Sequence, residues 1–261
     1  MIKYFEGSVF NAPVQAIVNT VNTTGAMGAG IALEFALRYP NMFDDYVEKC
    51  EKQIIQIGKM DYYNALDKKI VNFPTKQYFK YPSKLEWIEQ GLLDFVSTYK
   101  KEGITSIAFP KLGCANGKLN WFEVKRIMEK HLSSLDIDVY ICLDNLNEAD
   151  GKEKEMLDLF NNYNIENLSK KIKLTDSQTN YLVSKTPFNR FWQIGLEKPI
   201  KGVAYKKIFN FFYNYTPEDD EPKQLSLFWH IKKQMVAHLL LILPASLFIE
   251  IWVESVEVFA V

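Results

Sequence analysis

The sequence predicts an α/β fold, with a mixed sheet between helices, over residues 1–145. Short apolar runs rich in β-branched residues alternate there with stretches of helical periodicity. Two of these runs lead into glycine-containing loops that open on predicted helices, and folds of this class bind ligands at such strand ends. Hydrophobic residues make up 48% of the 261 positions, which is enough for a real core in one large domain or two small ones.

The predicted elements follow from these periodicities. Strands are expected at 2–5, 16–19, 60–65, 69–73, 106–109 and 139–143. Helices are expected at 30–38, 41–57, between 83 and 103, and at 120–132. Two capping patterns mark helix starts, Ser83 with Glu86 and Asn120 with Glu123. Together they give a sheet with helices on its faces.

The first glycine loop lies in the segment 16–35, AIVNTVNTTGAMGAGIALEF, between a predicted strand and a predicted helix. Its glycines have the spacing G-x-x-G-x-G, which is neither the Rossmann nor the Walker pattern: Gly25, Gly28 and Gly30. Such a loop presents backbone N–H groups and a helix dipole to an anion, usually a phosphate. A plain tight turn is the alternative. Asn19 and Asn22 favour a ligand, because buried amides need partners that a sugar hydroxyl can supply.

The second glycine loop is FPKLGCANGKL at 109–119. Its length and its paired glycines, Gly113 and Gly117, favour ligand contact over an ordinary strand-to-helix turn. Cys114 lies inside the loop, but no histidine is close in sequence to activate its thiol. We therefore expect Cys114 to have a packing role.

Lys76 follows the predicted strand 69–73 through a proline and a threonine. A lysine in this place can be partly desolvated, which lowers its pKa toward a nucleophilic amine, or it can be a solvated surface residue. The residues after it alternate between aromatic and basic side chains, namely Tyr78, Phe79, Lys80, Tyr81 and Lys84. This stretch predicts either nucleic-acid stacking or aromatic core, and the sequence leaves both open.

Three segments in order carry a family resemblance: IVNTVNTTGAMGAGIALEF at 17–35, VNFPTK at 71–76 and FPKLGCANGKLNW at 109–121. Together they resemble macro domains, the ADP-ribose-binding modules, and most closely the DarG-type branch that removes ADP-ribose from modified DNA. The resemblance implies a three-layer macro-domain fold for 1–147. The region 148–261, with an acidic linker at 216–223, has no recognisable family and is expected to have an α or α+β fold.

The resemblance also implies roles for individual residues. Lys76 corresponds to the lysine implicated at the distal ribose C1″ in DarG-type relatives, with Lys80 as a substitute, and Asn22 is the second predicted catalytic residue. No cofactor or metal is implied. The residues expected to contact ADP-ribose are Ser8, Val9, Asn19, Thr20, Gly25, Met27, Gly28, Gly30, Ile31, Thr75, Gly113, Cys114, Ala115, Asn116 and Gly117.

Three positions depart from the family pattern. Ser8 stands where many macro domains have an aspartate that binds the adenine amine, so adenine recognition is expected to depend on Val9 and main-chain groups. Ala29 stands where DarG relatives often have a lysine. Glu34, the nearest acid to the first loop, is expected to be a solvated helix residue.

The region after the resemblance contains several distinct segments. Aromatics alternate with basic residues over 185–215, which favours a small aromatic core over nucleic-acid binding. QLSLF, directly after the acidic linker, resembles the peptide that docks bacterial proteins into the DNA sliding clamp, or it starts a local strand or helix: Gln224, Leu225, Leu227 and Phe228. The apolar tail 235–261 is interrupted too often for a bilayer-spanning helix, so no membrane partner is expected.

Three functions remain open. The first is an ADP-ribosyl glycohydrolase acting on ADP-ribosylated DNA, with a thymidine-type base and an antitoxin-like role opposite a cognate ADP-ribosyltransferase toxin. The second is a non-catalytic ADP-ribose-binding module, and the third an interaction-type antitoxin or phage protein that acts through its C-terminal half. A net charge of −1 argues against a generally basic nucleic-acid binder. Three widely spaced cysteines and an N-terminus without a signal-peptide core indicate a cytoplasmic protein.

Overall fold

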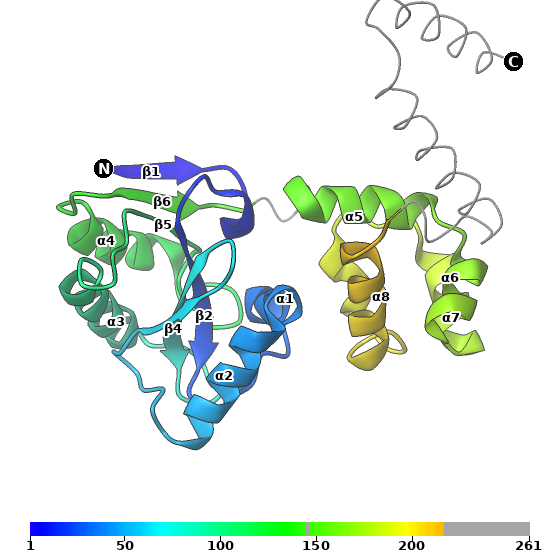
Figure 1. Cartoon of the computed structure of the whole chain (residues 1–261), viewed down its shortest axis with the longest axis horizontal. Coiled ribbons are helices and arrows are strands. Elements are labelled where there is room, and N and C mark those ends of the chain that lie inside the picture. The colour runs from blue at the N-terminus through cyan, green and yellow to red at the C-terminus, as the bar shows by residue number, and fades with distance from the viewer. Residues whose placement is uncertain (145–146, 217–261) are drawn as a thin grey trace, which may run out of the picture. The chain divides into compact units, whose positions relative to one another are not determined.

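The computed structural model describes residues 1–144 and 147–216. A six-stranded mixed sheet forms the centre of residues 1–144, in the order β1-β6-β5-β2-β4-β3. Figure 1 shows this sheet with its helices. All neighbouring strands are parallel except β3, which pairs antiparallel with β4 at the edge. The strands are β1 (Ile2–Phe5), β2 (Ala16–Asn22), β3 (Asp61–Asn64), β4 (Lys69–Lys76), β5 (Ser106–Phe109) and β6 (Asp138–Cys142).

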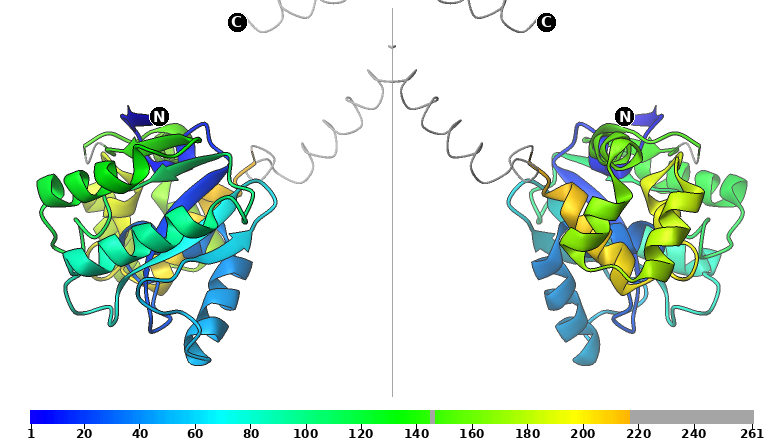
Figure 2. Two further views of the ribbon diagram at one scale, coloured as in Figure 1. Left: turned by 90° about the vertical axis from the view of Figure 1, so that its left-hand side faces the viewer. Right: turned by 90° about the vertical axis from the view of Figure 1, so that its right-hand side faces the viewer.

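Helices cover both faces of the sheet, which confirms the predicted α/β architecture. α3 (Leu85–Thr98) and α4 (Trp121–Leu132) lie on one face. α1 (Gly30–Arg38) and α2 (Pro40–Glu51) lie on the other, together with the short helix η1 (Val9–Asn11). Figures 1 and 2 show the two helical layers on opposite sides of the strands.

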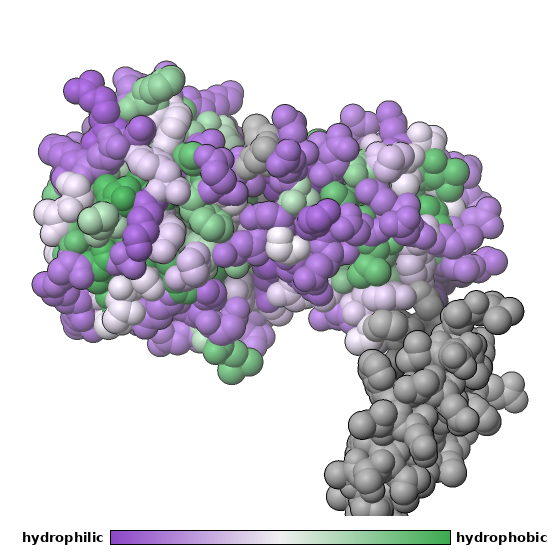
Figure 3. All heavy atoms as spheres, turned by 90° about the horizontal axis from the view of Figure 1, so that it is seen from above, coloured by the Kyte–Doolittle hydropathy of each residue, from purple (hydrophilic) through white to green (hydrophobic). Residues whose placement is uncertain are grey.

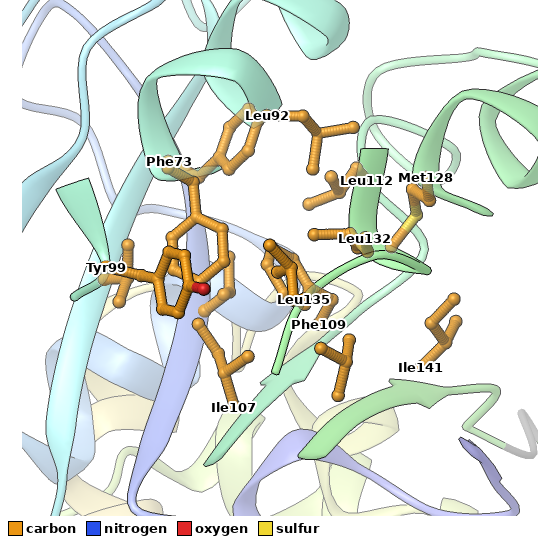
Figure 4. Packing of buried hydrophobic residues seen from close by; sticks show 14 of the residues in the cluster. Phe73, Leu92, Tyr99, Ile107, Phe109, Leu112, Met128, Leu132, Leu135 and Ile141 are labelled. Atoms are coloured by element: carbon orange, nitrogen blue, oxygen red, sulfur yellow. The ribbon is translucent and has the colours of Figure 1, made fainter. Parts of the chain in front are cut away.

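The two cores follow from the alternation of side chains along the buried strands. On β2, Ala16 and Val18 face the α3–α4 core, whereas Ile17 and Val21 face the α1–α2 core. Figure 4 shows the first of these cores, where the aromatic side chains of the strands meet leucines of the helices and loops. The central strands therefore have no polar face, and only their ends are left to contact a ligand.

The strand and helix ends differ in places from the sequence prediction. β2 and β4 each extend three residues further, to Asn22 and Lys76, because they pair in parallel over that whole length. α2 ends at Glu51 and not at 57, since Gln53 adopts a left-handed backbone (φ 57°). Both differences arise from backbone conformation that hydrophobic periodicity does not report.

One predicted capping box is wrong and the other cap is confirmed. α3 begins after Lys84 with no side-chain capping bond, and Ser83 is instead buried, with its backbone amide donating to the Gly117 carbonyl at 3.0 Å. Contact with the second glycine loop therefore replaces capping for Ser83. At α4 the Asn120 side chain does accept a bond from the Phe122 amide, at 2.8 Å.

Residues 147–216 fold as helices, and no strand occurs among them. Aromatic rings packed edge to face fill the interior of this helical segment, which confirms the predicted aromatic core. Leu33 and Leu37 of α1 pack against that core, so Met1–Tyr213 form one compact unit. The elements are α5 (Gly151–Asn162), α6 (Ile165–Ile172), α7 (Asp176–Lys185), η2 (Phe191–Gly195) and α8 (Val203–Tyr213).

Several sequence predictions concern parts of the chain that the structure does not describe. The end of the acidic linker, the clamp-docking peptide 224–228 and the apolar tail lie outside the described residues. The domain boundary at 147 also stays a prediction. Among the described residues, no helix has both the length and the apolar character needed to cross a membrane.

Candidate functional site

The ends of β2 and β4 bring the predicted residues of two motifs together. The parallel register places Asn19 opposite Asn72, and Asn22 opposite Lys76. Because these are the carboxyl ends of adjacent parallel strands, their side chains lie at the edge of the sheet where α/β folds bind ligands. The predicted pair Asn22 and Lys76 are therefore direct neighbours.

A buried amide network lies beneath this edge. The Asn19 Nδ2 donates to Asn72 Oδ1 at 3.0 Å, and the Asn72 Nδ2 donates to Asp61 Oδ2 at 2.9 Å. The Asn19 Nδ2 also lies 3.7 Å from the sulfur of Met27, a buried residue of the first glycine loop. Asn19 and Met27, both predicted to contact ligand, thus contact each other, and Asn19 lies beneath the loop to which Met27 belongs.

Asn22 holds the first glycine loop in shape. Its Oδ1 accepts bonds from the Thr24 amide at 2.9 Å and the Thr24 hydroxyl at 2.7 Å. Its Nδ2 donates to the Ala26 carbonyl at 2.6 Å. An asparagine that bonds its own following backbone makes an Asx turn, so its amide is occupied in positioning the loop.

The first loop leads into a helix end that no side chain caps. Gly25 (φ 78°) and Gly30 (φ 58°) adopt the left-handed backbone that glycine allows without strain. α1 starts at Gly30 after Ala29, with no side-chain capping bond and no acidic residue in its first turn. Its first backbone amides and the positive end of its dipole are therefore available to an anion.

The second loop is folded back on itself with very little room. The Leu119 amide donates to the Gly113 carbonyl at 3.0 Å. A Cβ on Gly117 would lie 2.2 Å from the Gly113 oxygen and 2.4 Å from the Ser83 hydroxyl, so the fold requires glycine there. Within the described residues, the amides of Ala115, Asn116 and Gly117 donate to no protein acceptor.

The two glycine loops meet across the ends of the strands. The position of a Cβ on Gly30 is 2.8 Å from the side-chain nitrogen of Asn116. Unpaired main-chain donors of the second loop therefore lie close to the uncapped start of α1. Two such sets of N–H groups at one place suit an extended anion such as a diphosphate.

Lys76 joins the end of β4 to the second loop. Its Nζ donates to the Asn116 carbonyl at 2.5 Å and to the Phe79 carbonyl at 3.4 Å. Two causes lower the pKa of the Lys76 ammonium below its usual 10.5: partial burial, which is the larger, and repulsion from Lys118. The amine is thus held at the meeting point of the loops and loses its proton more readily than a solvated lysine.

The other loop residues have supporting positions. Thr75 is buried and donates to the Val21 carbonyl at 3.3 Å, Thr20 is half-buried in the strand, and Ile31 packs against the α1–α2 core. The Cys114 sulfur donates to the Leu112 carbonyl at 3.4 Å, and burial raises the pKa of this thiol to about 11. A thiol that stays protonated near neutral pH agrees with the predicted packing role.

Asp150 is a candidate site residue that no sequence motif indicates. Its Oδ2 accepts a bond from the Ser8 amide at 3.0 Å, next to the buried side chain of Val9. Its other oxygen, Oδ1, is buried and has no hydrogen-bond partner within the described residues. Asp150 precedes α5, outside the resembling segments, and only the tertiary fold returns it to the loop after β1.

The expectation for Glu34 is wrong. Its carboxylate pairs with Arg38 at 2.6 Å and its side chain is 24% exposed. Burial raises the pKa of Glu34, because the helical segment packs over this face of α1 and places Tyr205 and Phe209 beside it. Glu34 is therefore an interface residue and not a solvated one.

Comparison with known proteins agrees with this geometry. A family model described as Macro domain matches residues 18–128. A DNA ADP-ribosyl glycohydrolase of Thermus aquaticus is 40% identical over 146 residues, which cover 54% of this chain and 41% of that protein. The chain thus spans about two fifths of the length of this curated relative.

Solved structures extend the match to three dimensions. Thermosipho africanus DarTG in complex with ADP-ribose is 33% identical, with a TM-score of 0.53, over 57% of this chain and 43% of that one. The macrodomain of Thermus aquaticus DarG is 40% identical, also with a TM-score of 0.53, over 55% of this chain and 98% of that one. Since nearly all of a solved macrodomain is matched at this identity, the chain belongs to the macro domain family.

Proposed function

We propose that this protein is an ADP-ribosyl glycohydrolase that releases ADP-ribose from a modified base in DNA, most specifically a thymidine-type base. The observation that supports it best is the position of Lys76, whose amine lies where two loops with free main-chain donors meet. The relatives that are named DNA ADP-ribosyl glycohydrolases share this part of the chain at 40–42% identity. This chain matches only about two fifths of the length of these relatives, so for this chain the activity is a proposal.

In the proposed mechanism the glycine loops bind the diphosphate and Lys76 acts at the distal ribose. Main-chain N–H groups and the start of α1 neutralise the phosphates. The neutral Lys76 amine forms a bond to C1″ as the bond from C1″ to the base breaks, and the base leaves with the bonding electrons and takes up the proton that the lysine nitrogen loses. Water then breaks the bond between the lysine nitrogen and C1″, which releases ADP-ribose and restores the amine. The lowered pKa of Lys76 supports the role of its neutral form.

The surface beside Lys76 supports a nucleic-acid substrate. Tyr78 lies 4.6 Å from the ring of Phe79 and 5.3 Å from that of Tyr81, measured between centroids. Phe79 is 45% exposed and Tyr81 is 63% exposed, so this cluster is not part of the core. Exposed aromatic rings next to lysines offer stacking surfaces for bases and partners for phosphates. Of the two alternatives the sequence left open, these exposures favour stacking.

Incubation of the full chain with single-stranded DNA that contains an ADP-ribosylated thymidine tests this proposal. Free ADP-ribose and unmodified DNA are the expected products, separated by chromatography. ADP-ribose binding in calorimetry without any release would instead support the non-catalytic binding module. A cognate ADP-ribosyltransferase that makes the substrate remains a prediction, as does the sliding clamp as a partner.

We expect Gly117→Ala to weaken ADP-ribose binding by about tenfold or more. The added Cβ would overlap the Gly113 oxygen, so the second loop must open and its donors move. Gly91→Ala is the matched control, because its Cβ would overlap the Phe73 ring inside the core and leave the loops alone. Calorimetry below the melting temperature of each variant measures the affinity. An equal loss in both variants would show that instability, not loop geometry, is the cause.

We expect Asp150→Asn to lower ADP-ribose affinity by about tenfold, the usual worth of one bond to a charged group. The unpartnered Asp150 oxygen lies near the Ser8 amide, in the place where macro domains bind adenine. This oxygen can accept a hydrogen bond from the adenine amine. Calorimetry with an analogue that has hypoxanthine in place of adenine provides the test. The wild type should prefer adenine and Asp150→Asn should not, whereas Asp158→Asn, on the exposed side of α5, should behave as the wild type. Equal preference in all three proteins would exclude this role.

A further inference from the structure

Three buried oxygen atoms of the candidate site have no hydrogen-bond partner within the described residues. They are Asn19 Oδ1, Ser83 Oγ and Asp150 Oδ1. The other buried side-chain atom of this kind in the described part of the chain, Asp45 Oδ2, lies 2.6 Å from the Lys49 ammonium and so has a cation beside it. Because buried polar atoms are normally satisfied, the three exceptions are informative. They gather at one place, with one oxygen next to each loop that is expected to contact ADP-ribose.

Ser83 is the one of these three residues that the proposed function does not use. It lies between β4 and α3 and is only 5% exposed. Polar residues of the described chain lie mostly at the surface, as Figure 3 shows for one face of the molecule. The place of Ser83 just before α3 would allow its hydroxyl to cap that helix, but no side chain caps it. The hydroxyl is therefore buried without the partner that the nearest helix offers.

The Ser83 hydroxyl faces the two glycines of the second loop. A Cβ on Gly117 would lie 2.4 Å from Ser83 Oγ, and a Cβ on Gly113 would lie 3.2 Å from the same oxygen. The Ser83 amide donates to the Gly117 carbonyl at 3.0 Å, so the backbone of Ser83 is tied to this end of the loop. Only the absence of side chains on both glycines lets the hydroxyl approach the loop so closely.

A partner for the hydroxyl is available within the loop after a small movement. The Gly113 carbonyl oxygen lies 2.2 Å from the Cβ position of Gly117, and Ser83 Oγ lies 2.4 Å from that same point. The carbonyl accepts from the Leu119 amide and has a second lone pair. Since an unsatisfied buried hydroxyl is unfavourable, any form of the loop that gives it a partner is favoured over the ligand-free form by that cost.

We propose that Ser83 is a positioning residue of the diphosphate site. When a diphosphate binds the free amides of residues 115–117, the second loop settles on Ser83 and the hydroxyl donates to the Gly113 carbonyl. Ser83 thus strengthens binding of the diphosphate through the loop, from the side away from the ligand. The inference rests on the proposed binding of ADP-ribose and adds a residue to that site, but it does not depend on cleavage of the glycosidic bond.

Ser83→Ala in the full chain tests this role, because its two expected effects have opposite signs. Calorimetry should show ADP-ribose affinity weaker by about fivefold to tenfold, the usual net effect of one hydrogen bond. Thermal unfolding of the ligand-free variant should show a Tm that is higher by about 2–4 °C, since the substitution removes an unsatisfied buried group. A residue that only supports the fold would lower the affinity and the Tm together.

A series of ligands shows which part of ADP-ribose the effect concerns. ADP, which has the diphosphate but no distal ribose, should lose the same factor of affinity in Ser83→Ala as ADP-ribose does, and adenosine should lose none. Ser97→Ala is the matched control, because Ser97 is exposed on α3 and its hydroxyl donates to the Asp94 carbonyl at 2.8 Å. This control should bind ADP-ribose within about twofold of the wild type and unfold within about 2 °C of it.

The outcomes separate this inference from the proposed function. If the wild type binds ADP-ribose, the inference alone is overturned by equal affinity of Ser83→Ala, by a Tm that falls together with the affinity, or by a loss that occurs with ADP-ribose but not with ADP. The last of these results would place the effect of Ser83 at the distal ribose. Absence of ADP-ribose binding by the wild type would refute the proposed function, and the inference with it.

Discussion

Lys76→Ala is expected to lower the rate of ADP-ribose release from modified DNA by about a thousandfold or more, within the range for loss of a positioned catalytic group. The amine is held between the Asn116 and Phe79 carbonyls, at the meeting point of the two loops, and no other described lysine is bound there. Single-turnover measurement of free ADP-ribose gives the rate. Binding of ADP-ribose should change much less, because main-chain donors and not the amine hold the diphosphate.

Lys80→Ala is the matched control for this prediction. Lys80 is four residues further along, and its Nζ lies 5.6 Å from the ring centroid of Phe79, on the exposed aromatic cluster. Its removal should weaken binding of the DNA substrate but leave the rate of the bound complex within about threefold, as for one exposed charge contact. Full activity of Lys76→Ala, or a larger loss in Lys80→Ala, would show that the catalytic lysine has been misplaced.

The pH dependence distinguishes two roles for the same amine. If neutral Lys76 attacks C1″, the rate must rise with pH until the amine has lost its proton, and then level off. Because burial and Lys118 lower the pKa of Lys76, that rise should occur below the usual 10.5. Lys118→Gln removes the repulsion, raises the pKa of Lys76 and should move the rise to higher pH. A rate that falls as pH rises would instead indicate that the charged form stabilises the departing base.

The parts of this site that sequence could predict are those whose signal is local. Glycine spacing at Gly25 and Gly113 reports backbone that only glycine adopts easily, and the apolar runs before them report buried strands. The end of β4 is harder to predict from sequence, because Pro74 normally argues against a strand. Here Pro74 stands opposite Val21 in a parallel pair, beside the bulge that follows Val21, and the strand continues to Lys76. Lys76 therefore lies at the end of a strand, where its backbone is fixed, and not in a loop.

The remaining differences arise from residues that meet only in the folded chain. Ser83 matches a capping box, but the second glycine loop packs on it and removes it from the helix end. Glu34 is on the polar face of an amphipathic helix, and nothing within α1 shows that α8 will cover it. Asp150 reaches the loop after β1 because the chain continues from β6, where the Asp144 amide donates to the Gly7 carbonyl at 3.2 Å. Neither hydrophobic periodicity nor a sequence motif reports contacts between residues that are far apart in the chain.

Arg190→Ala is expected to destabilise the protein by about 3–5 kcal/mol, the usual cost of removing one partner of a buried ion pair. The Arg190 side chain is 3% exposed and bonds both carboxylate oxygens of Glu153, Nε to Oε1 at 2.9 Å and Nη2 to Oε2 at 2.6 Å. Its Nη1 lies 3.3 Å from Asp144 at the end of β6. Truncation leaves the Glu153 carboxylate buried without its cation. The carboxylate also accepts a hydrogen bond from the Phe191 amide, but this neutral group cannot replace the positive charge of Arg190.

Thermal unfolding should show this loss as a fall in Tm of about 6–20 °C, from about 2–4 °C per kcal/mol for a unit of this size. The double variant Arg190→Met/Glu153→Leu should lose clearly less, because an apolar pair of similar volume needs no counter-charge in the aromatic core. Lys152→Ala, which breaks an exposed pair, should change Tm by no more than about 2 °C. Arg190 joins the helical segment to the end of β6. A single cooperative transition that shifts as a whole would therefore show that Met1–Tyr213 unfold together. An unchanged Tm would show that the ion pair adds no stability beyond the packing of the aromatic core against α1.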